Sequence, residues 1–105
     1  MFNEMQDNLQ RLDTMLKTMK KRGQEYAQAE MDYKIALRTE ILKLRDEGQP
    51  VTIVKDLCYG TKEVARKRME RDIAEANYRV IQEAIQTHKL KVRIIENQLD
   101  REFRS

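Results

Sequence analysis

The side chains with the widest chemical range are a single cysteine, Cys58, and a single histidine, His88. Paired with each other or with carboxylates, such residues serve as nucleophile, general base or metal ligand. Cys58 has no second cysteine at a metal-ligand spacing and no histidine near it in the sequence. His88 falls among apolar residues at helical spacing, which is typical of a core histidine. The carboxylates are spread as helix-surface charges, and we therefore expect no enzyme activity, cofactor or metal site.

Basic side chains form a sharper pattern, in three short clusters. The clusters are Lys17, Lys20, Lys21 and Arg22; Arg66, Lys67, Arg68 and Arg71; and Lys89, Lys91 and Arg93. Counting back from the middle of the chain places the first and third at the same height of a helical hairpin, as one merged patch. Such a patch suits a nucleic-acid backbone or an acidic protein. Interspersed acidic residues favour a merely solvated face, and the few aromatic residues argue against stacking on single strands.

Composition limits the elements that could position these residues. The chain has 105 residues, of which 37% are charged and 40% hydrophobic, with no tryptophan and a net charge of +3. This profile is typical of long helices with a narrow apolar face, and the net charge alone is too small to indicate nucleic acid. No apolar run approaches the roughly 20 residues of a membrane helix. We expect one cytoplasmic domain over residues 1–105, without a membrane contact.

Apolar spacing predicts two long helices, over about residues 3–47 and 62–102. In each, apolar side chains alternate three and four positions apart, as on the seam of a coiled coil. The residues expected to carry assembly on these seams are Leu9, Leu12, Leu16, Ile81, Ile85, Val92 and Ile95. The predicted fold is all-α, an antiparallel hairpin of long helices with a short helix at the joint.

The joint, residues 47–61, carries its own signals. Gly48 and Pro50 end the first helix, Thr52 is expected to cap a short helix over 52–59, and Gly60 closes it. Thr61 is expected to cap the second long helix. Because a plain joint needs only a few residues, we expect the apolar Ile53 and Leu57 to be buried inward, with Lys55, Asp56 and Tyr59 outward.

Part of the chain resembles short phage and prophage proteins of Gram-positive bacteria. The residues that carry the resemblance are A-L-R-T-E-I-L-K-L-R-D-E-G-Q-P-V-T over 36–52, then Asp56, Leu57 and Gly60, and V-A-R-K-R-M-E-R-D-I-A-E-A-N-Y over 64–78. The resemblance covers about two-thirds of the chain, from Tyr33 to Leu99. It implies a small cytoplasmic protein of a bacterial host, encoded near phage recombination or replication genes, and it brings no catalytic residues.

The sequence thus favours a non-enzymatic binding or scaffold protein that self-associates, with a dimer expected. Two alternatives stay open at this point. One is direct binding of nucleic acid through Lys17, Lys20, Lys21, Arg22, Lys89, Lys91 and Arg93. The other is inhibition of a host protein by direct binding, without affinity for nucleic acid.

Overall fold

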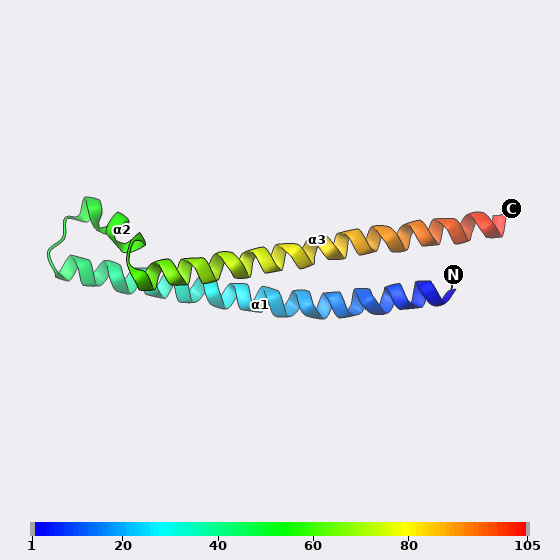
Figure 1. The fold of residues 1–105 in the computed structure, drawn as a ribbon, viewed down its shortest axis with the longest axis horizontal. Coiled ribbons are helices and arrows are strands. Elements are labelled where there is room, and N and C mark those ends of the chain that lie inside the picture. Colours follow the sequence, from blue (N-terminus) through cyan, green and yellow to red (C-terminus); the bar gives the residue numbers. More distant parts are fainter. Residues whose placement is uncertain (1, 105) are drawn as a thin grey trace. The chain divides into compact units, whose positions relative to one another are not determined.

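The computed structural model describes residues 2–104 and contains three helices in that range: α1 (Phe2–Asp46), α2 (Val51–Tyr59) and α3 (Lys62–Arg104). The described residues include no strand. The two long helices pack against each other, with the short α2 between them in the chain (Figure 1). The all-α hairpin with a short helix at its joint is confirmed. Each helix begins and ends within two residues of the expected bounds.

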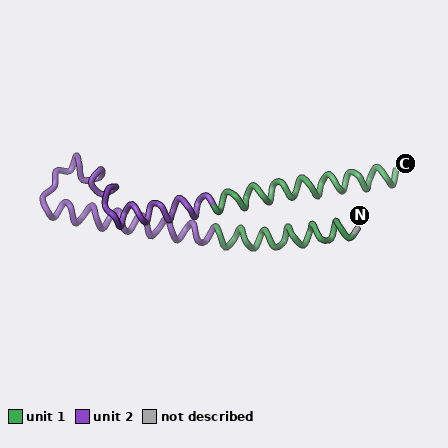
Figure 2. The backbone as a smooth tube through the Cα atoms, viewed as in Figure 1, with its two compact units in different colours: residues 1–22, 77–105 green, residues 23–76 purple. Residues whose placement is uncertain are grey.

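Contacts divide the chain into two compact units (Figure 2). The terminal unit comprises residues 1–22 and 77–105, so it holds the first part of α1 and the last part of α3. The joint unit comprises residues 23–76, with the rest of both long helices and all of α2. That residues 1–105 behave as a single domain stays a prediction.

The seam of the terminal unit, meaning the positions turned toward the other long helix, follows the expected spacing on α3. Ile85, His88 and Val92 are buried there, and the remaining positions are half-buried: Tyr78, Ile81, Ile95 and Leu99. These seven positions alternate three and four residues apart, as predicted. The last part of α3 therefore turns one narrow, largely apolar stripe toward α1.

On α1 the seam of the terminal unit differs from the expected one. It runs through Met5, Asn8, Leu12, Met15 and Met19, of which Asn8 is buried and the others half-buried. Leu9 and Leu16, which we expected on this seam, remain 48% and 40% exposed beside it. Of the three expected residues of α1, only Leu12 lies on the observed seam, and Asn8 and Met15, each one residue earlier, take the places of Leu9 and Leu16. Because Asn8 is polar, the apolar pattern predicted Leu9 on the seam instead.

The end of α1 is fixed by a glycine turn. Gly48 has φ = +83°, in the left-handed region that favours glycine. Its N–H donates to the carbonyl of Arg45, and the N–H of Gln49 donates to the carbonyl of Leu44. These two bonds form a Schellman motif, which satisfies carbonyls at the end of the helix. Pro50 then precedes Val51, the first residue of α2.

α2 buries a different face from the expected one. Val54 and Cys58 are buried, whereas Ile53 and Leu57 are 43% and 41% exposed. Both pairs are four residues apart, so helical spacing allows either pair to face inward. The smaller pair faces inward here, and Val64 at the start of α3 is fully buried as well. The expectation that Ile53 and Leu57 are buried is therefore wrong.

The expected threonine caps also differ. The residue before α2 is Pro50, with no side-chain cap, and Thr52 lies inside the helix. The hydroxyl of Thr61 donates to the carbonyl of Cys58 across 2.8 Å, so this oxygen closes the end of α2 instead of capping α3. Thr61 does accept the first helical bond of α3, from the N–H of Ala65 to its carbonyl. It thus belongs to both helix ends.

Within the joint unit, α3 begins partway along α1. A shallow pocket is lined by Asp32, Ile35, Ala36, Thr39 and Glu40 of α1 together with Glu63 and Lys67 of α3. The first turns of α3 therefore lie level with residues 32–40, and α2 lies beside the C-terminal end of α1 (Figure 1). This placement sets the register between the long helices.

Candidate functional site

A buried polar contact crosses the terminal unit. His88 is 8% exposed and Asn8 is 5% exposed. The Nε2 atom of His88 lies 2.8 Å from the backbone carbonyl oxygen of Asn8. Because a carbonyl can only accept, Nε2 carries the proton and donates. His88 is therefore a hydrogen-bonded core histidine on the seam, and the contact fixes one register between α1 and α3 in this unit.

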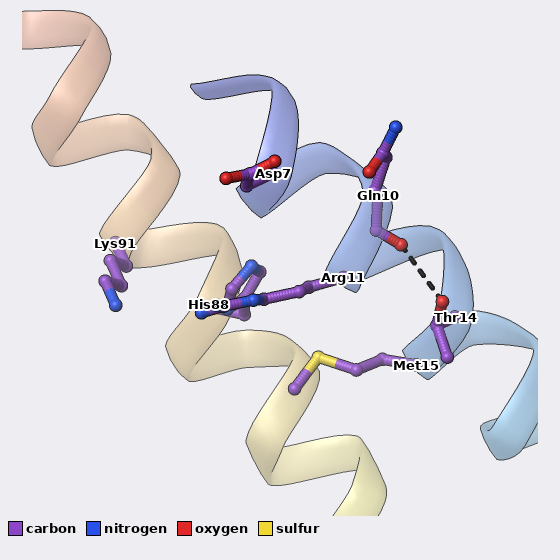
Figure 3. Close-up of a pocket in the computed structure, with 7 residues that line it drawn as sticks. All are labelled: Asp7, Gln10, Arg11, Thr14, Met15, His88 and Lys91. Carbon is purple, nitrogen blue, oxygen red and sulfur yellow. Dashed lines mark hydrogen bonds between the residues drawn. The ribbon is translucent and has the colours of Figure 1, made fainter. Parts of the chain in front are cut away.

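Beside this contact lies an open groove of about 650 Å³. Its lining residues come from α1 and α3: Asp7, Gln10, Arg11, Thr14, Met15, His88 and Lys91. Arg11 extends from α1 toward the His88 side of the groove (Figure 3). Two of the lining side chains are cationic, Arg11 and Lys91, and one is acidic, Asp7. The groove therefore has charged groups on both helices.

The first and third basic clusters both belong to the terminal unit, but they are offset along it. Lys91 and His88 line a groove with residues 7–15, and His88 contacts Asn8, so residues 89–93 lie level with the first turns of α1. The centre of the cluster Lys17, Lys20, Lys21 and Arg22 lies about twelve residues beyond Asn8, or roughly 18 Å further along α1. The two clusters therefore lie at different positions along the paired helices. Counting back from the middle of the chain assigned to the long helices residues that in fact form α2.

Side-chain pairing differs among these cations. Lys17 pairs with Asp13 across 3.2 Å. Arg22 also has a polar or electrostatic partner. Among the described ion pairs, none includes the other cations of the two clusters, which are Lys20, Lys21, Lys89, Lys91 and Arg93. Whether these residues bind a ligand stays a prediction.

The second basic cluster is occupied by neighbouring side chains of the joint unit. Arg66 pairs with Glu63 at 2.7 Å, Lys67 with Glu70 at 3.3 Å, and Arg71 with Asp72 at 2.8 Å. Arg68 lies over the ring of Tyr59, 5.3 Å from its centroid. The carboxylate partners offset three of the four positive charges, so the cluster offers little net charge to an external ligand.

Arg71 lies on the seam of the joint unit, in the position that an apolar residue would normally take. Its guanidinium carbon is 4.5 Å from the ring centroid of Tyr33, which is itself buried. The hydrogen bonds that Arg71 donates to Asp72 chiefly raise the pKa of Arg71, and the charges of Asp72 and Glu30 act in the same direction against desolvation. The joint unit therefore holds a permanent cation on its inner face.

Large apolar side chains of the joint unit lie on the surface. Eight of them are between 41% and 74% exposed: Met31, Ile35, Leu42, Val51, Ile53, Leu57, Met69 and Ile73. Met31, Ile35 and Leu42 follow one side of α1, and Met69 and Ile73 follow one side of α3, as positions four and seven apart do in a helix. A shallow groove of about 400 Å³ lies along the α1 side, lined by Ala27, Glu30, Met31, Lys34, Ile35 and Arg38.

Cys58 is not accessible to a substrate or a metal ion. The residue is fully buried. Burial raises the pKa of the Cys58 thiol, and the negative charge of Glu40 raises it further. Both effects disfavour the thiolate, which is the nucleophilic and metal-binding form. The described residues include no group of three or more potential ligands that could hold a metal ion.

The residues expected to carry assembly have mixed positions. Ile85 and Val92 are buried inside the terminal unit, and Leu12, Ile81 and Ile95 are half-buried there. Only Leu9 and Leu16 present a substantial surface. The sequence did not single out Arg11, Asp7, Ile35 or Ile73 for a role in binding. For Ile35 and Ile73 a signal existed, since each continues an apolar stripe opposite the seam.

Comparison with known proteins identified no matching family model, curated protein or solved structure. The resemblance to short phage proteins therefore stays a prediction. Among the described residues, the structure includes no helix that is both long enough and apolar enough to cross a membrane.

Proposed function

We propose that this chain is a non-catalytic binding or scaffold protein that self-associates through the outer apolar faces of its joint unit. The observation that supports this most directly is an inversion of polarity. The inner seam of α3 in the joint unit carries Lys67 and Arg71, while Met69 and Ile73 lie on the surface. In a helical hairpin that stays monomeric, the apolar side chains of each helix face the other helix and the charged side chains face water.

The energies favour an interface that uses more than one helix face. Burying the exposed half of one such side chain contributes on the order of 1 kcal/mol. Association costs about 4–15 kcal/mol in lost freedom of motion. The three apolar residues of α1 alone do not offset this cost. The outer faces of α1, α2 and α3 together supply eight side chains, or about 8 kcal/mol, which is comparable to the cost of association.

Charge favours a second copy as the partner on this surface. The joint unit holds ten basic and eleven acidic side chains, so two copies do not repel each other there. The terminal unit holds eleven basic and seven acidic side chains, and two of these units repel each other. Self-association through the joint unit keeps the like charges of the terminal units outside the contact. A two-fold dimer is the commonest form of such an assembly.

Sedimentation velocity across the micromolar range tests the proposal. Ile73→Asp, on the outer face of α3 in the joint unit, is expected to yield a monomer. Ile94→Asp is the matched control, because Ile94 lies on the same helix in the terminal unit and the two isoleucines are 53% and 51% exposed. Circular dichroism checks that both variants keep their helices. A monomeric parent chain, or equal effects of the two substitutions, would contradict the proposal.

A further inference from the structure

The groove of the terminal unit has the charges of an anion site that spans two helices. Arg11 on α1 and Lys91 on α3 line the same hollow of about 650 Å³. Together they present up to eight N–H donors and two positive charges. Neither side chain belongs to an ion pair within the described chain. Both are exposed, so a ligand meets them without any rearrangement of the helices.

The wider charge distribution favours an extended ligand over a single small anion. The chain's positive excess lies in the terminal unit, with eleven basic against seven acidic side chains. Along α1, Lys20 and Lys21 lie beyond the groove, and Lys89 and Arg93 lie two positions from Lys91 on α3, on a different face of that helix. All four are exposed. Arg11 and Lys91 on opposite sides of one groove, within a unit of positive excess, fit a polymer with regularly repeated negative charge.

The lining residues indicate which part of such a polymer is bound. The groove contains no phenylalanine, tyrosine or tryptophan, and base stacking on such rings is the usual means of holding single strands. Arginine and lysine are the usual ligands of backbone phosphates, which carry no sequence information. We propose that the Arg11–Lys91 groove binds the phosphate backbone of duplex nucleic acid, without reading the bases.

Substitution of Asp7 is expected to change the affinity in the opposite direction from substitution of Arg11 or Lys91. It is the one acidic side chain that lines the groove, and it repels a phosphate that Arg11 and Lys91 attract. Removing its charge by Asp7→Asn therefore strengthens binding at this groove. Removing a cation by Arg11→Gln or Lys91→Gln weakens it. Diffuse attraction by net charge predicts no preference for these positions over any other exposed charge.

Fluorescence anisotropy with a short, labelled DNA duplex of mixed sequence is the experiment. Arg11→Gln and Lys91→Gln are each expected to lower affinity severalfold and to reduce the salt dependence by about one phosphate contact. Asp7→Asn is expected to raise affinity. Lys55→Gln is the matched control, because it removes the same charge from an exposed position on α2 in the joint unit, and it is expected to leave affinity unchanged.

Three outcomes overturn the inference. The first is no binding of the duplex at low salt. The second is an equal loss in Lys55→Gln and Arg11→Gln, which reports diffuse charge. The third is displacement of the duplex by polyglutamate at equal charge concentration, which assigns the groove to an acidic protein. None of these outcomes depends on the oligomeric state, which is measured separately by sedimentation of the same samples.

Discussion

His88 of α3 donates a hydrogen bond from Nε2 to the backbone carbonyl oxygen of Asn8 on α1, across 2.8 Å and 80 positions of sequence. Both residues are buried. A polar pair at this depth has few alternative partners, because a shift of the helices would leave a buried donor unpaired. The contact therefore selects one register in the terminal unit, at a place where apolar residues alone would tolerate several.

Removal of the imidazole tests this relationship. His88→Ala leaves a cavity and deletes the hydrogen bond, so we expect the free energy of unfolding to fall by about 2–3 kcal/mol. Thr87→Ala, at the exposed neighbouring position, is expected to change it by less than about 0.5 kcal/mol. Urea unfolding followed by circular dichroism at one fixed protein concentration measures both. Equal effects of the two substitutions would show that the contact is dispensable.

The buried thiol predicts a pH dependence. Burial, and secondly Glu40, raises the pKa of Cys58 from its ordinary value of 9.0. Because the folded state favours the neutral thiol, this contribution to stability is complete below pH 9.0 and is lost as pH rises toward the higher folded-state pKa. The stability difference between the parent chain and Cys58→Ala is expected to shrink above that pH, by up to about 1.4 kcal/mol per pH unit.

The free energy of unfolding of both proteins is measured at several pH values, and the difference taken at each pH removes the contributions that the two proteins share. A thiol reagent provides an independent measurement. It is expected to react slowly with the folded chain and rapidly in concentrated urea, since the residue is fully buried. A difference that stays constant with pH, together with fast labelling of the folded chain, would refute the buried thiol.

The two glycines of the joint are expected to respond in opposite ways to alanine. Gly48 has φ = +83°, where a β-carbon is strained, so Gly48→Ala is expected to cost about 1 kcal/mol. Gly60 has φ = −87°, and an added β-carbon meets only the carbonyl oxygen of Leu57 at 3.7 Å. Gly60→Ala is therefore expected to be neutral or to stabilise by up to about 1 kcal/mol. Thermal unfolding of the two variants measures the contrast; the reverse order would rule out the turn at Gly48.

Local sequence patterns predicted the structure correctly where they allowed only one interpretation. The seam of α3 in the terminal unit was predicted correctly, because Ile81, Ile85, Val92 and Ile95 continue the alternation of three and four positions without a break. The stop at Gly48 was predicted for a similar reason, since glycine and proline restrict backbone angles wherever they occur. These features depend on residues only a few positions apart.

Where two alternative sets of residues satisfied the same helical spacing, residues distant in the sequence decided which set is buried. Leu9 and Leu16 are more apolar than Asn8 and Met15, yet the second pair lies on the seam, where the backbone carbonyl of Asn8 accepts a hydrogen bond from His88. Likewise, Val54 and Cys58 are buried in place of Ile53 and Leu57, because the smaller pair fits the closely packed start of α3. No signal within either segment distinguishes the alternatives.

By itself, the sequence determined three helices, their order, their limits to within two residues and the turn that separates the first two. Backbone preferences and the helical repeat are properties of short segments, so they can be read without knowing the partner. Only the tertiary structure decided the register, since α2 takes up chain length beside the end of α1. That register brings Arg11 together with Lys91 and separates the two basic clusters that the residue count had merged. The tertiary structure also places Arg71 over Tyr33 on the inner seam, whereas Met69 and Ile73 lie on the surface. Which face of a helix is buried is decided only when the two helices pack against each other.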